Sequence, residues 1–187
     1  MTTKILMSFA MANHGSTFSH WLRNELMKTY GLYSVDSVYV DSIVARSIGG
    51  DVDVAPDKRL HMKSPTGAFP IGAMRDDWNA LYTTAMRSAE VMLFCYTKEF
   101  EASDWCRLEW TQFLLEKSRR GKGTPLRGVI LEFKKCELFG SVDESISKVI
   151  VKKTDGGGRG MAWDRGDYVL DDSDYVQVVE AIGDLGR

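Results

Sequence analysis

The chain has few of the residues that build disulfide frameworks or metal sites. Its 187 residues include three cysteines (Cys95, Cys106 and Cys136) and three histidines. The cysteine count is odd, no two cysteines form a C-x-x-C pair, and the histidines do not stand at zinc-ligand spacing. This composition favours a reduced, cytoplasmic protein without a structural metal.

Long apolar runs and a strong charge of one sign are also missing. No stretch approaches the ~18 consecutive apolar residues that a membrane span needs. The short apolar run near the start, "KILMSFAM", leads into a helical pattern without a convincing cleavage site, and we interpret it as a strand rather than a signal peptide. The net charge of −2 gives no general attraction to nucleic acids or anionic membranes. We therefore expect neither kind of partner.

The sequence has one basic stretch and no standard catalytic motif. The basic stretch "KSRRGKGTPLRG" (117–128) ends a helical pattern, where cations complement the helix dipole, and we interpret it as a solvated helix end. "GGGRG" (156–160) lacks the strand and helix of a dinucleotide fingerprint, and "RGKGTP" lacks the glycine spacing of a phosphate loop. Neither G-x-S-x-G nor H-E-x-x-H occurs. Cys106 has no evident histidine partner and is expected to be a packing residue.

Apolar runs of strand length alternate with amphipathic helical patterns along the chain. Strands are predicted at 4–11, 37–40, 90–96 and 126–133, with weaker candidates at 145–153 and 161–163. Helices are predicted from a cap at Ser16 to a stop at Gly31, over 76–89, over 103–120, and from about residue 173 to 185. This alternation predicts a single domain over 1–187, an α/β fold of three layers with a central parallel sheet and helices on both faces.

Residues 42–76 form a long segment with little periodicity. It contains three of the four prolines, Pro56, Pro65 and Pro70, and several glycines. A loop of this length inside a compact domain is usually functional or disordered. We interpret it as a long inserted loop with room for a short helix or hairpin.

Glu109 occupies an unusual place on the helix that "SDWCRLEW" (103–110) opens. With Trp105 at zero and about 100° per residue, Glu109 falls at about 40°, inside the apolar arc. An unpaired ionised carboxylate costs several kcal/mol to bury, so such a residue needs a partner, a raised pKa or a cleft. Two interpretations follow: an ion pair at the core edge with Arg87 or Arg107, or a functional carboxylate.

Three loops are expected at one edge of the predicted sheet. In open parallel sheets, ligands bind outside the carboxyl ends of the strands. The loop "AMANHGS" after the first strand, the long loop after the second, and "TKEFEASDW" all emerge there. We therefore expect Ser8, Phe9, the 42–76 loop and the Trp105–Glu109 turn to surround a single pocket.

Two stretches of the chain resemble the Toll/interleukin-1 receptor (TIR) domain family. The strand "ILMSF", a polar turn and the helix "FSHWLRNEL" resemble the first box of TIR domains. The stretch "WNALYTTAMRSAEVMLFCYTKEFEASDWCRLEW" resembles the central TIR segment, in which a helix and a buried strand precede Ser-x-Trp-Cys-x-x-Glu. The matches extend from about residue 4 to 133. The acid commonly found after the first box is absent, and 134–187 is atypical, matching only in general pattern.

The resemblance implies a flavodoxin-like TIR fold and the activity of stand-alone bacterial TIR enzymes of the Thoeris antiphage type. Many bacterial and plant TIR domains cleave NAD at the nicotinamide–ribose bond, and their catalytic glutamate matches Glu109. Trp105 matches the aromatic residue four positions earlier. Ser8 and Phe9 match the strand end that borders the nucleotide pocket, and 42–76 takes the place of the loop over it. NAD would be a substrate, and no cofactor is implied.

The same resemblance implies partners. The product would be an ADP-ribose derivative, linear, cyclic or conjugated, that diffuses to a separate effector protein, and self-association is expected. Two other functions fit the same residues. One is a non-catalytic TIR interaction or adaptor module, and the other is an enzyme similar to nucleoside deoxyribosyltransferases, which also place a glutamate at a ribosyl carbon.

Overall fold

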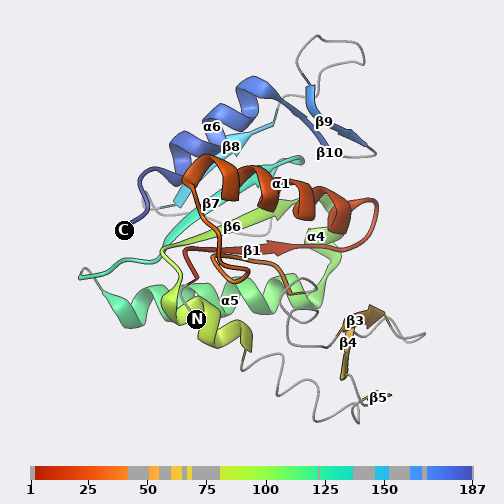
Figure 1. Ribbon diagram of the computed structural model, residues 1–187, viewed down its shortest axis with the longest axis vertical. Coiled ribbons are helices and arrows are strands. Elements are labelled where there is room, and N and C mark those ends of the chain that lie inside the picture. The colour runs from red at the N-terminus through yellow and green to blue at the C-terminus, as the bar shows by residue number, and fades with distance from the viewer. Residues whose placement is uncertain are drawn as a thin grey trace.

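A five-stranded parallel sheet forms the centre of the molecule (Figure 1). The computed structural model describes residues 3–41, 51–54, 60–64, 67–68, 81–121, 123–136, 146–151, 161–165 and 168–186. The strands are β1 (Ile5–Phe9), β2 (Val38–Tyr39), β6 (Val91–Tyr96), β7 (Arg127–Glu132) and β8 (Ile146–Ile150). Their spatial order is β2-β1-β6-β7-β8, which is the flavodoxin-like order 2-1-3-4-5.

Helices cover both faces of this sheet. Helices α1 (Gly15–Tyr30) and α6 (Asp172–Ile182) lie on one face, and α5 (Asp104–Arg120) lies on the other with the helical residues 81–88 (Figure 1). A short helix, α4 (Lys98–Ala102), follows β6 directly. The three-layer α/β fold predicted from the alternation of strands and helices is confirmed.

Two apolar clusters lie on the two faces of the sheet. Side chains alternate along a strand, so Ile5 and Met7 pack in the cluster with α1 and α6, while Leu6 packs in the cluster with α5. In the cluster with α5, the ring centroids of Phe94 and Trp110 lie 5.0 Å apart. All six residues of β6 are buried, which explains its continuous apolar run.

The start of α1 differs from the prediction. We expected Ser16 to cap this helix, but the helix begins at Gly15 and its N-cap residue is His14, which makes no side-chain cap hydrogen bond. His14 adopts a left-handed backbone with φ of 70°, so a tight turn, not a side-chain cap, sets the helix start. The predicted stop at Gly31 is confirmed, with φ of 61°.

The short strands outside the central sheet were predicted only in part. Within the long loop, β3 (Asp51–Val54), β4 (Leu60–Ser64) and β5 (Gly67–Ala68) pair antiparallel, and the rest of 42–76 lies outside the described residues. Near the C-terminus, β9 (Met161–Arg165) contains the predicted 161–163 strand and pairs antiparallel with β10 (Tyr168–Asp171). These strands are short and mix polar with apolar residues, so they give weak periodic signals. The "GGGRG" loop lies outside the described residues.

Gly15 is required where the chain leaving β1 turns into α1. A Cβ atom at this position would lie 1.8 Å from the backbone carbonyl oxygen of Ala10. Backbone has to move to relieve this clash, so we expect Gly15→Ala to lower the free energy of unfolding by up to about 3 kcal/mol in urea titrations. Gly123→Ala is the matched control, because a Cβ there meets no atom within 4 Å. Equal stability of the two variants would contradict this account.

Candidate active site

The candidate site lies at the carboxyl end of β1, beside β6. The strand order reverses between these two strands, and in such sheets ligands bind outside the carboxyl ends at this point. Ser8 is paired in register with Phe94 there. The segments that leave the two strands also meet, because the side-chain amide of Asn13 donates a hydrogen bond to Glu99 in α4. Two of the three loops expected at this edge therefore lie together.

Glu109 reaches this strand end from the second turn of α5. The Ser8 hydroxyl donates a hydrogen bond to Oε2 of Glu109. Both residues are buried, with 0% and 6% of their surface exposed. The ion pair considered for Glu109 is not what the structure has, because Arg107 donates to the backbone carbonyl of Glu101 and Arg87 lines a cavity at the amino ends of the strands. Among the described residues, the neutral hydroxyl of Ser8 is hydrogen-bonded to this carboxylate.

Burial and a neighbouring acid change the titration of Glu109. Its pKa is raised from the ordinary 4.5 to about 8, first by loss of hydration and second by the negative charge of Asp41. The hydroxyls of Ser8 and Tyr82 act in the opposite direction, since they stabilise the ionised form. At neutral pH the carboxyl group is therefore largely protonated, and a cation placed beside it would favour its ionisation.

Three further residues belong to this site and were not singled out from the sequence. Asp41 follows β2 and contributes charge, and Tyr39 and Tyr82 are buried with ring centroids 6.2 Å apart at 80°. Burial raises the pKa of both tyrosines, and the charges of Asp41 and Glu109 raise it further. The sequence signal that could have identified Asp41 is its position directly after the predicted strand 37–40, at the edge where the loops converge.

The remaining predicted residues divide between the two faces of the sheet. Trp105 packs against the α5-side cluster that contains Tyr39 and Tyr82. Phe9 packs against the opposite cluster, with α1, because it follows Ser8 by one residue and side chains alternate. The structure therefore brings Ser8 and Trp105 to the face of Glu109 and does not bring Phe9 there. Cys106 is buried, and burial raises the pKa of its thiol, as expected for a packing residue.

The described residues contain no group of three or more His, Cys, Asp or Glu side chains placed to hold a metal ion. None of the helices described here has the length and apolarity to cross a membrane. No protein-family model, curated protein or solved structure matches the chain.

The raised pKa of Glu109 predicts a pH-dependent stability difference. Between pH 4.5 and about 8 the folded chain keeps a proton on Glu109 that the unfolded chain has released. This group therefore lowers the free energy of unfolding as pH rises, by at most about 1.4 kcal/mol per pH unit. Glu109→Gln removes the effect, so we expect the variant to gain stability relative to the wild type between pH 5 and 8 in urea titrations. Exposed Glu180→Gln is the control, and a pH-independent difference for Glu109→Gln would contradict the assignment.

Proposed function

We propose that this protein cleaves NAD at the bond between nicotinamide and ribose, with Glu109 as the catalytic carboxylate. The observation that carries the proposal is the buried Glu109, hydrogen-bonded to Ser8 at the strand-order reversal between β1 and β6. The resemblance of "ILMSF" and "SDWCRLEW" to TIR boxes supports the same residue.

Cleavage of the nicotinamide–ribose bond suits a single carboxyl group that ionises when the substrate binds. Nicotinamide leaves NAD as a neutral molecule from a cationic ring, so no strong general acid is required. The breaking bond transfers positive charge to the ribose, and an anion beside the sugar stabilises that charge. The cationic nicotinamide–ribose unit itself lowers the pKa of a nearby carboxyl group, so substrate binding would release the Glu109 proton to solvent.

The neighbours of Glu109 suit the same role. Asp41 adds negative charge at the strand end, which increases attraction for a cationic sugar. Ser8 fixes the position of the carboxylate. Trp105 offers a flat aromatic surface on the same face for the leaving ring.

Attack on the ribose by water would give ADP-ribose, and attack by an internal group would give a cyclic product. Such a product would signal to a separate effector, in the manner of an antiphage system.

Product chromatography after incubation with NAD tests the proposal. We expect nicotinamide release by the wild type and at least ~100-fold slower release by Glu109→Gln, because the developing charge loses its anion. Glu180→Gln removes a carboxylate on α6 and should keep full activity. The assay includes cell extract from phage-infected cultures as a possible activator.

The same assay separates the other functions. Transfer of a base between deoxynucleosides with intact NAD would assign a deoxyribosyltransferase-like enzyme. Intact NAD with identical behaviour of wild type and Glu109→Gln under all conditions would sink the proposal and leave the interaction module.

The pH profile gives an independent prediction. Catalysis needs the anionic form of Glu109, whose pKa is raised to about 8, so kcat/KM should rise about tenfold per pH unit below pH 8. The profile of kcat should level off at lower pH, because bound cationic substrate lowers that pKa. Ser8→Ala should move the kcat/KM midpoint upward, since the Ser8 hydroxyl stabilises the ionised form. A flat profile from pH 5 to 9 would argue against Glu109.

A further inference from the structure

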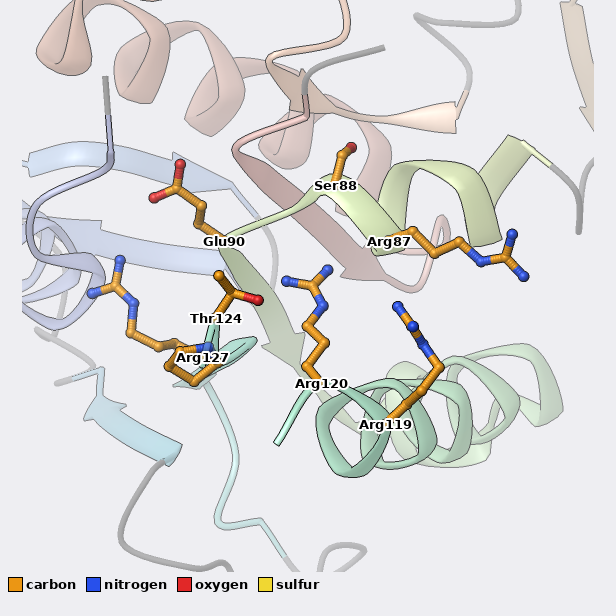
Figure 2. Close-up of a pocket in the computed structure, with 8 residues that line it drawn as sticks. Arg87, Ser88, Glu90, Arg119, Arg120, Thr124 and Arg127 are labelled. Carbon is orange, nitrogen blue, oxygen red and sulfur yellow. The ribbon is translucent and has the colours of Figure 1, made fainter. Parts of the chain in front are cut away.

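A cavity lies at the edge of the sheet opposite Glu109, near the amino ends of β6 and β7. Its volume is about 710 Å³, within the usual size of small-molecule pockets. Its lining residues come from the end of helix 81–88, the residues before β6, the end of α5, and the turn into β7 (Figure 2): Arg87, Ser88, Glu90, Arg119, Arg120, Thr124, Pro125 and Arg127. Glu109 and Ser8 do not line it.

Positive charge is concentrated in this cavity. Among the described lining residues, four arginines face one carboxylate, Glu90, in a chain whose net charge is −2. Glu90 is already paired with Lys4 at 2.6 Å. Figure 2 shows Arg87, Arg119 and Arg120 on one side of the cavity and Glu90 with Arg127 on the other. Local guanidinium charge therefore exceeds the carboxylate charge that faces it.

Glu116, which stands just behind the lining, reduces this excess without cancelling it. One carboxylate serves two arginines there, with Arg119 bound through both Glu116 oxygens at 2.8 and 2.7 Å and Arg120 at 2.9 Å. The C-termini of helix 81–88 and α5 each add the equivalent of about half a negative charge. Glu116 and the two helix C-termini therefore hold the arginines in place, and the net charge around the cavity remains positive.

The arginines have different roles. Arg120 is 9% exposed and donates to the backbone carbonyls of Ala89, at 2.6 Å, and Met86, so it holds α5 against helix 81–88. Arg119 binds Glu116 through Nε and Nη2 and has 63% of its side chain exposed, so its guanidinium is accessible to a ligand while Glu116 holds it in place. Arg87 is exposed and lines the cavity from the opposite helix.

We propose that this cavity binds a small anion with two or more linked phosphate groups, of the nucleoside diphosphate class, between Arg87 and Arg119. Guanidinium groups bind phosphate oxygens in bidentate geometry, and two arginines from different helices fit two linked phosphates. Thr124 adds a hydroxyl donor at the rim. A concave site on an acidic chain favours a small molecule over a nucleic-acid strand, which requires an extended basic surface.

Calorimetric titration with inorganic pyrophosphate, ADP and adenosine tests the proposal. We expect pyrophosphate and ADP to bind and adenosine not to bind. The double variant Arg87→Gln/Arg119→Gln should weaken both affinities about tenfold or more, because each guanidinium makes a charge-assisted hydrogen bond. Lys28→Gln/Lys148→Gln removes the same charge elsewhere and should leave both affinities nearly unchanged. Glu109→Gln should also leave pyrophosphate binding unchanged, which separates this site from the proposed NAD site.

Three results would overturn the proposal: no binding of pyrophosphate or ADP at millimolar concentration, equal weakening in both double variants, or tighter binding of an oligonucleotide than of ADP through the same arginines. Thermal unfolding checks that the variants are folded. If the double variant does not fold, the single exposed change Arg87→Gln is compared with Lys28→Gln, and a loss of affinity confined to Arg87→Gln is the expected result.

Discussion

Burial of the central strands on both faces is the constraint on which the rest of this structure depends. Every residue of β6 is buried, and its backbone groups are used by parallel ladders to β1 and β7. Charged side chains therefore have few places within the sheet and gather at its two edges. Parallel pairing sends all carboxyl ends to one edge, where Ser8 meets Glu109, and all amino ends to the other, where the arginines gather.

The architecture and the unusual position of Glu109 could be predicted because each depends on a local sequence pattern. The five strands of the central sheet have apolar runs, and the four longer helices, α1, 81–88, α5 and α6, have helical spacing of apolar residues. Glu109 lies inside the apolar arc of α5. Its partner could not be predicted in this way. An arginine is the partner that charge alone suggests for a buried carboxylate. The register of β1 beside β6 and the position of α5 instead place the Ser8 hydroxyl next to Glu109. The influence of Asp41 on the Glu109 pKa also depends on tertiary proximity.

The positions of two other features also depend on the fold and not on the local sequence pattern. Phe9 stands at the same strand end as Ser8, but alternation turns its side chain to the α1 face. The amino-edge cavity was hidden for a different reason. The stretch 117–128 was interpreted alone as a solvated helix end, which agrees with the positions of Arg119 and Arg120 on the last turn of α5. Arg87 and Glu90 come from the segment before β6, far from 117–128 in the sequence, and only the fold brings the two segments together.

Helix α5 shows how strongly the two edges differ. Glu109 and Glu116 are seven residues apart, so they share a face of this helix, and both are largely buried. Loss of hydration and then the charge of Asp41 raise the pKa of Glu109 to about 8, whereas Arg119 and Arg120 lower that of Glu116 to about 2. Glu116 is therefore a permanent anion that holds arginines in place. Glu109 is a carboxyl group that an arriving cation can ionise, and this difference makes it the better candidate for chemistry.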